Sequence, residues 1–227
     1  ANAHISIISG AYDPESGRSK LISDINNIKN KLKKIDGIFH VVPTVKSQVM
    51  ASKNNRNTGV QVFGLTKDDM KALELLAEPE SFEGSIEDFN PGIAIGGGVA
   101  RDLGVKIGDT IKLISPQGVE TLMGTSPRIS VFEVTYIFSV GRYDIDKVRV
   151  YVPIRSAQLF FNREGLYDQV DLIVSNPLNI EKFKVLDLCI DSNGLPIDFK
   201  LLNRIGGGIF GGSKDKCLIW YDLYYKM

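Results

Sequence analysis

A ten-residue run, Val131–Val140, consists almost wholly of β-branched, aromatic and aliphatic residues, which predicts a long β-strand. An earlier segment, Thr110–Ile114, alternates polar and apolar residues with a period of two and is expected to be its antiparallel partner. The residues between them, Gly118–Arg128, are more numerous than a tight hairpin needs, so they predict a loop on a rigid pair of strands. Such a loop is either a solvated connection or a binding element.

The first third of the chain predicts an α+β arrangement, in which one helix face packs on a sheet. Apolar residues recur at helical spacing over Ser19–Lys34, and Gly37 follows as a helix terminator. Strands are expected on both sides of this helix, at residues 4–9, 38–45, 48–51 and 59–64.

A second helix is expected to begin at Thr66, whose hydroxyl suits an N-cap, and to stop before Pro79. Asp68 and Asp69 fall in its first turn, where the helix dipole favours carboxylates. Further along, residues 171–174 predict a strand and residues 179–187 predict another helix.

The composition excludes several classes of protein. The chain has 227 residues, 27 acidic and 27 basic, with a hydrophobic share of 43%, which is typical of a globular protein and argues against a broad nucleic-acid surface. No apolar run is long enough to cross a membrane by itself. His4, His40, Cys189 and Cys217 are isolated from one another, so we expect no metal ion and no cofactor.

Two segments invite a catalytic interpretation. Gly96-Gly97-Gly98 follows an apolar run and could place backbone N–H groups on a phosphate, but its spacing matches neither nucleotide-binding fingerprint, so a tight strand-to-helix turn is the favoured interpretation. Residues 78–88 form an acidic connector without an accompanying histidine, lysine or ligand cluster, which favours a solvated segment. A small phosphate-ligand-binding enzyme that uses the glycine turn is kept as the alternative from a different class.

Several segments resemble one family in their order and spacing. The longest runs from Ile95 to Gly118 and includes Val99-Ala100-Arg101, Leu103-Gly104-Val105-Lys106 and Gly108-Asp109-Thr110; the others are residues 59–65, 127–128, 137–141 and 151–160. Together they resemble the MacB-like core domain of lipoprotein-releasing ABC transporter permeases of the LolC/LolE type. The resemblance extends over roughly residues 1–184, and beyond Val185 the glycines of residues 194–212 interrupt the helix that the family has there.

The resemblance implies a periplasmic domain of a bacterial inner-membrane protein, placed between the permease's first and second membrane helices. It implies a discontinuous, membrane-proximal α/β lobe (Porter-like) from residues 1–64 and 155–227. An inserted, mostly β lobe (Sabre-like) would comprise residues 65–154 and carry a hook-like hairpin loop at about 118–130. The family implies no catalysis in this domain, because ATP hydrolysis belongs to a separate cytoplasmic subunit whose motion the domain transmits.

In LolC-type members the corresponding loop is a hook that engages a periplasmic lipoprotein chaperone. By position, the hook residues here are Met123, Gly124, Thr125, Ser126, Pro127 and Arg128. Glycine permits unusual backbone angles, proline stiffens the return, and arginine offers several donors to a partner's carbonyls or carboxylates. We therefore expect these six residues to dock the chaperone.

The implied partners are a LolA-like periplasmic lipoprotein chaperone, the lipoprotein cargo, a second permease subunit (the same or a different one) and the cytoplasmic ATPase subunit, with no nucleic acid. LolE-type members keep a related loop without the same chaperone role. The closest alternative is the periplasmic domain of a related drug or toxin exporter permease.

Overall fold

The computed structural model describes residues 5–8, 12–13, 18–19, 21–121, 124–176 and 218–221 of the chain. These residues divide into two compact units, one built from residues 44–164 and the other from 2–43 together with 165–227. The boundaries between the two units therefore lie between residues 43 and 44 and between residues 164 and 165. The lobes expected from the family, 1–64 with 155–227 and 65–154, stay a prediction. The predicted helix at residues 179–187 lies outside the described residues.

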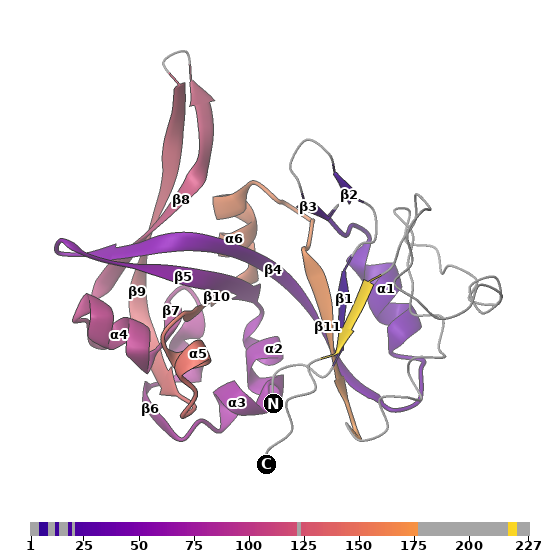
Figure 1. The fold of residues 1–227 in the computed structure, drawn as a ribbon. Coiled ribbons are helices and arrows are strands. Elements are labelled where there is room, and N and C mark those ends of the chain that lie inside the picture. Colours follow the sequence, from indigo (N-terminus) through magenta and orange to yellow (C-terminus); the bar gives the residue numbers. More distant parts are fainter. Residues whose placement is uncertain are drawn as a thin grey trace. The chain divides into compact units, whose positions relative to one another are not determined.

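The discontinuous unit is a small sheet with one described α-helix (Figure 1). Its strands lie in the order β12 (Leu218–Tyr221), β1 (Ile5–Ile8), β11 (Gln169–Val174) and the start of β4 (Ile38–Lys53), and its helix is α1 (Ile25–Leu32). Two-residue strands β2 (Tyr12–Asp13) and β3 (Arg18–Ser19) pair separately. The predicted strand at 171–174 is confirmed within β11.

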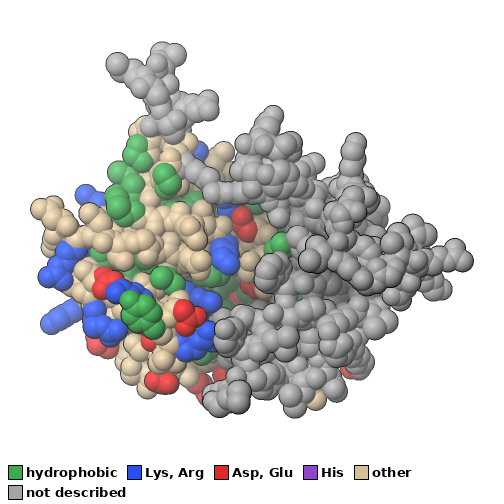
Figure 2. Space-filling model, in the orientation of Figure 1, with side chains coloured by type: hydrophobic (Ala, Val, Ile, Leu, Met, Phe, Trp, Pro, Cys, Tyr) green, Lys and Arg blue, Asp and Glu red, His purple; other side chains and the backbone are tan. Residues whose placement is uncertain are grey.

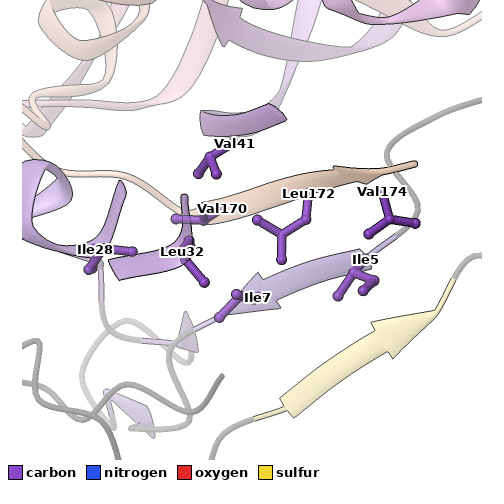
Figure 3. Close-up of a cluster of buried hydrophobic side chains, with 8 residues drawn as sticks. All are labelled: Ile5, Ile7, Ile28, Leu32, Val41, Val170, Leu172 and Val174. Carbon is purple, nitrogen blue, oxygen red and sulfur yellow. The ribbon is translucent and has the colours of Figure 1, made fainter. Parts of the chain in front are cut away.

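Aliphatic side chains from α1, β1, β4 and β11 form a core of this unit (Figure 3). Ile28 and Leu32 point from α1 toward side chains of β1 and β11, and Val41 joins them from β4. Among the described residues, the buried members of this core are Ile5, Ile7, Ile28, Leu32, Val41, Val170, Leu172 and Val174. The helical spacing in α1 and the period-two spacing in the strands place these residues on facing surfaces.

Helix α1 is shorter than the predicted Ser19–Lys34. Ile22, which fits the helical spacing, instead exchanges two backbone hydrogen bonds with Tyr167, at 2.7 and 2.9 Å. The helix ends at Leu32, and Gly37, with a φ of 91°, lies in the turn that follows rather than at the helix end. Tertiary pairing of the backbone thus overrides the local pattern at the N-terminal end.

The unit of residues 44–164 is built on a mixed sheet. Its strands follow the order β4, β5 (Arg56–Leu65), β10 (Arg149–Pro153), β7 (Ile93–Gly96), β9 (Gly124–Ser139) and β6 (Ser81–Gly84), and β8 (Thr110–Thr121) pairs with both β4 and β9. The β4–β5 hairpin turns at Asn54 and Asn55, both with positive φ, as a two-residue hairpin turn requires. The predicted pairing of Thr110–Ile114 with the 131–140 run is confirmed.

Short helices complete this unit: α2 (Lys67–Ala72), α3 (Glu74–Ala77), η1 (Ile86–Phe89), α4 (Gly97–Leu103), α5 (Tyr143–Asp146) and α6 (Ile154–Phe161). Thr66 is the N-cap of α2, as predicted, and its hydroxyl accepts a hydrogen bond from the Asp69 N–H at 3.1 Å. The single helix expected to run on toward Pro79 is divided at Leu73, which has an extended backbone.

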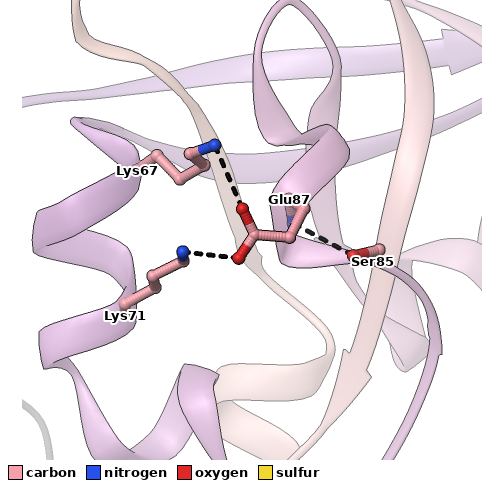
Figure 4. Close-up of polar contacts among 4 residues, drawn as sticks. All are labelled: Lys67, Lys71, Ser85 and Glu87. Carbon is pink, nitrogen blue, oxygen red and sulfur yellow. Dashed lines mark hydrogen bonds and ion pairs between the residues drawn. The ribbon is translucent and has the colours of Figure 1, made fainter.

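The acidic connector folds back on α2 (Figure 4). The Glu87 carboxylate pairs with Lys67 at 3.1 Å and with Lys71 at 2.5 Å, and the Glu87 N–H donates to the Ser85 hydroxyl. The Lys71 ammonium, followed by that of Lys67, holds the pKa of Glu87 below its ordinary value. The exposed carboxylate therefore ties η1 to α2, and the interpretation of residues 78–88 as a solvated segment agrees with the exposed β6.

Close packing explains the glycine cluster. A Cβ at Gly96 would overlap the Asp146 carbonyl oxygen, one at Gly97 would overlap the Ser139 hydroxyl, and one at Gly98 would lie 2.8 Å from the Asp146 oxygen. The three glycines thus let the turn from β7 into α4 lie against β9 and α5. This confirms the favoured interpretation of a strand-to-helix turn.

Candidate partner-binding site

The residues predicted as a long loop are mostly paired strand. Strands β8 and β9 stay paired from Thr110↔Glu133 out to Thr121↔Gly124, and Figure 1 shows them extending as a two-stranded ribbon. The prediction of a loop over Gly118–Arg128 is therefore wrong, because residues 119–121 of β8 pair with residues 124–126 of β9. We call residues 115–128 the arm.

A bulge interrupts the arm near its base. Ser115 lies opposite Arg128 and Val119 lies opposite Ser126, so the three residues 116–118 of β8 face Pro127 alone. Proline has no N–H to donate, so it is tolerated where the ladder is already broken. Gly118 is required on the other strand, because a Cβ there would overlap the Ser126 carbonyl oxygen. Gly118 and Pro127 thus shape a bulge inside a β-hairpin.

The structure places the six predicted hook residues as follows. Met123 lies outside the described residues, and Gly124 and Thr125 begin β9. Ser126 and Pro127 are exposed, while Arg128 is half-buried. Their assignment to chaperone docking stays a prediction.

An apolar surface lies at the base of the arm. Ile114 of β8 is directly opposite both Met50 of β4 and Ile129 of β9, so these three side chains share one face of the sheet. Val131 continues this face two residues along β9. Met50 is 40% exposed, Ile129 56% and Val131 58%. We call Met50, Ile114, Ile129 and Val131 the apolar row, and Figure 2 shows hydrophobic side chains gathered at the base of the arm.

A groove of about 930 Å³ runs along the same face. Met50, Ile114, Pro116 and Pro127 line it from β4, β8 and β9, and so does Gly59 of β5, the cross-strand partner of Met50. A Cβ at Gly59 would have no heavy atom within 4 Å, so the groove is open at this point. The arm and the β4–β5 hairpin together therefore offer a concave, mainly apolar surface.

Arg128 faces a different groove. Its neighbours on β9, Pro127 and Ile129, line this groove as well. A second hollow of about 670 Å³ is lined by Arg128 and Ser130 of β9 and by Ser156 and Leu159 of α6. Leu159 is 61% exposed. The arm can therefore present apolar side chains and a guanidinium beside the same hollow.

Sequence reasoning missed the apolar row and Leu159 as surface residues. A signal was present: β9 carries apolar side chains on both faces, with Ile129 and Val131 outward and Phe132 and Val134 inward. A strand with apolar residues on both faces indicates that both faces are covered, either within the fold or by a partner.

The described residues do not bring three or more His, Cys, Asp or Glu side chains together as a metal site would require. Across the same residues, no helix is long and apolar enough to cross a membrane. The class that the geometry defines is a two-unit α+β domain that presents a projecting β-hairpin arm with an exposed apolar base.

Comparison with known proteins gives the family. Residues 2–184 match the model of the MacB-like periplasmic core domain. The chain therefore belongs to the MacB-like periplasmic core domain family and is the periplasmic domain of an inner-membrane, ABC-type permease of the MacB/LolC type. The predicted resemblance, α+β fold class and periplasmic location are thereby confirmed.

Two similar proteins are named lipoprotein-releasing system transmembrane protein LolC. The one from Neisseria meningitidis serogroup B is 27% identical over 161 residues, which cover 69% of this chain and 38% of the relative. The one from Xylella fastidiosa is 28% identical over 127 residues, which cover 55% of this chain and 30% of the relative. The chain thus spans well under half the length of these relatives.

Two solved structures share the fold. The periplasmic region of MacB from Actinobacillus actinomycetemcomitans superposes with a TM-score of 0.53 at 14% identity, covering 96% of this chain and 87% of that one. The extracellular domain of the transporter YknZ from Gram-positive bacteria superposes with a TM-score of 0.52 at 17% identity, covering 88% of this chain and 92% of that one. At these identities the likeness concerns the fold alone.

Proposed function

We propose that the chain is the periplasmic domain of a lipoprotein-releasing permease, and that its arm docks a LolA-like periplasmic chaperone which receives the lipoprotein. The observation that carries the proposal is the pairing of a projecting arm with an exposed apolar row at its base. The similarity to proteins named LolC supports the lipoprotein-releasing class.

The physics of the arm suits a docking element. Its two strands hold each other in register, so little conformational entropy is lost when a partner binds. Ile129 and Val131 are exposed apolar anchors, and Arg128 adds a planar donor group that recognises carboxylates or carbonyls. Covering such a row by a partner removes apolar surface from water, which is the dominant favourable term in association.

In this proposal the domain performs no chemistry. ATP is hydrolysed on a separate cytoplasmic subunit, the motion reaches this domain through the permease's membrane helices, and a second permease subunit completes the assembly. The domain transmits the motion to the lipoprotein cargo and its chaperone. The Gly96–Gly98 turn takes no part, since those glycines serve the packing of α4.

The test is the affinity of the purified chain for the cognate periplasmic chaperone. Pro127→Ala and Arg128→Glu alter the predicted hook, and Ile129→Ser removes an apolar anchor from the row. Each is expected to weaken binding at least about tenfold, the usual effect of losing a buried interface anchor. Arg142→Glu, the same charge reversal beside α5, is the matched control and should bind like wild type.

Circular dichroism must show that every variant is folded. If the folded wild-type chain does not bind the chaperone, the docking proposal fails and the related exporter becomes the better assignment. If binding is unchanged in all three variants, the docking surface is not the arm.

A further inference from the structure

Strand β6 is an end strand of its sheet. Its residues Ser81–Gly84 pair along one edge with β9, and in the described part of the chain no strand pairs along the other edge. All four residues are exposed, and Phe82 is 62% exposed. Figure 1 shows β6 at the outer edge of its unit. An exposed edge of this kind is a template for pairing with another chain.

The pairing register of β6 with β9 identifies the backbone groups of β6 that point toward its open edge. The Ser85 N–H donates to the Thr135 carbonyl at 3.2 Å, which makes this a hydrogen-bonded pair of the antiparallel ladder. Hydrogen-bonded and non-bonded pairs alternate, so Glu83↔Ile137 is the next hydrogen-bonded pair. The N–H and C=O groups of Phe82 and Gly84 therefore point away from β9, toward the open edge.

A groove of about 680 Å³ lies beside this edge strand. Ser81 and Glu83 of β6 form one wall, α4 forms the other, and Ile137 and Ser139 of β9 form the floor. Phe82 points to the opposite face of the sheet, where its ring lies 5.9 Å from that of Tyr136. A chain added to β6 would thus find an aromatic surface on one face and this groove on the other.

Arg101 gives the groove its charge preference. Its Nη1 would lie 3.7 Å from a Cβ at Gly97, beside the Ser139 hydroxyl on the groove floor. Within the described residues Arg101 forms no ion pair, whereas the exposed Arg142 pairs with Asp144 at 2.9 Å. Among the described residues that line the groove, Arg101 and Lys106 are cationic and Glu83 is anionic, so the charge of the groove complements an anionic side chain.

We propose that the open edge of β6 binds an extended segment of a partner protein by strand addition, and that a glutamate of this segment reaches into the groove to Arg101. Main-chain hydrogen bonds to Phe82 and Gly84 supply the pairing, as in other edge-strand complexes. The Arg101 guanidinium, which binds carboxylates through two parallel donors, supplies the sequence preference. This surface is separate from the arm and does not depend on chaperone docking.

The experiment titrates the isotope-labelled chain with a capped seven-residue peptide, followed by amide chemical shifts. The peptide alternates valine and threonine around a central glutamate. We expect saturable shifts at Phe82 and Gly84, and about fivefold weaker binding when the glutamate is replaced by glutamine. In the Arg101→Gln chain the two peptides should bind equally, whereas the Arg142→Gln chain should retain the preference for glutamate.

A peptide with N-methyl groups on its pairing edge separates strand addition from loose adsorption. It cannot donate to β6, so its binding should be lost. Equal binding of the N-methylated peptide, shifts that map away from β6, or no saturable shifts with the parent peptide would each overturn the proposal. The affinity for the chaperone is measured separately, so failure at β6 and failure at the arm are distinguishable.

Discussion

The Ser126 carbonyl oxygen occupies the space that a Cβ at Gly118 would need. This contact joins the two strands of the arm beside the bulge, where three residues of β8 face Pro127. The shape of the arm therefore depends on glycine at a position that lacks a positive φ and would otherwise accept any residue. The requirement comes from close approach of two backbones rather than from a turn.

Replacement of Gly118 by alanine should disturb the arm without unfolding the domain. The added methyl group meets backbone, which cannot rotate away, so the strands must separate locally. We expect faster amide hydrogen exchange at residues 115–128 and unchanged exchange in β5. Gly59→Ala adds the same methyl group where no heavy atom lies within 4 Å, and should leave exchange at the arm unchanged. Equal exchange at the arm in both variants would contradict this reading of the bulge.

The aliphatic core of the discontinuous unit should carry much of its stability. Leu172 is fully buried among the core residues of β1 and α1, so Leu172→Ala is expected to lower the free energy of unfolding by about 2–5 kcal/mol. Phe39→Ala removes a larger side chain that is 72% exposed, and this substitution should change the free energy of unfolding by less than about 0.5 kcal/mol. Urea denaturation measures both, and similar losses in the two variants would refute the assignment of the core.

The Tyr136 hydroxyl should make stability fall at alkaline pH. It donates to the Leu76 carbonyl at 3.0 Å, and burial raises its pKa above the ordinary value. A raised folded-state pKa gives stability that is present below the unfolded-state pKa and is lost as pH rises through the folded-state value. Tyr136→Phe should cost about 0.5–1.5 kcal/mol at neutral pH and flatten the alkaline loss. If the stability of the Tyr136→Phe variant falls at alkaline pH as steeply as that of wild type, the prediction is contradicted.

The Glu87 bridge predicts the opposite pH dependence. Because Lys71 and Lys67 lower the pKa of Glu87, its contribution is present above the unfolded-state pKa and is lost as pH falls through the lowered value. Glu87→Gln should therefore lower the melting temperature at neutral pH, and the two proteins should converge in strong acid. The difference should also shrink in high salt, since the bridge is exposed. A difference that persists in acid would show that the carboxylate charge is not responsible.

Long, strongly patterned segments could be predicted from the sequence, whereas their ends could not. The apolar run of β9 could be predicted from β-propensity, and its partner in β8 from the period-two alternation of polar and apolar residues. The start of α1 does not, because Ile22 satisfies the helical spacing and yet pairs its backbone with Tyr167, far along the chain. Only the folded chain brings that partner close.

The arm shows why the same residues can mislead. Gly118 and Pro127 usually mark loops, and here they mark a bulge between paired strands, which sequence spacing does not distinguish from a loop. The apolar row was likewise hidden, because Met50, Ile114 and Ile129 come from three strands and meet only through the register. Arg101 lay within a recognised motif, but its position on the groove beside β6 depends on the packing of α4.

The most direct test of the central claim is photo-crosslinking in the intact permease with its chaperone. A photoreactive amino acid replaces Ile129 on the apolar row or, as the control, Tyr143 on α5, which is 74% exposed. If the arm docks the chaperone, light should join the chaperone to position 129 and not to position 143. Crosslinking of the chaperone at position 143 with none at position 129 would contradict the claim.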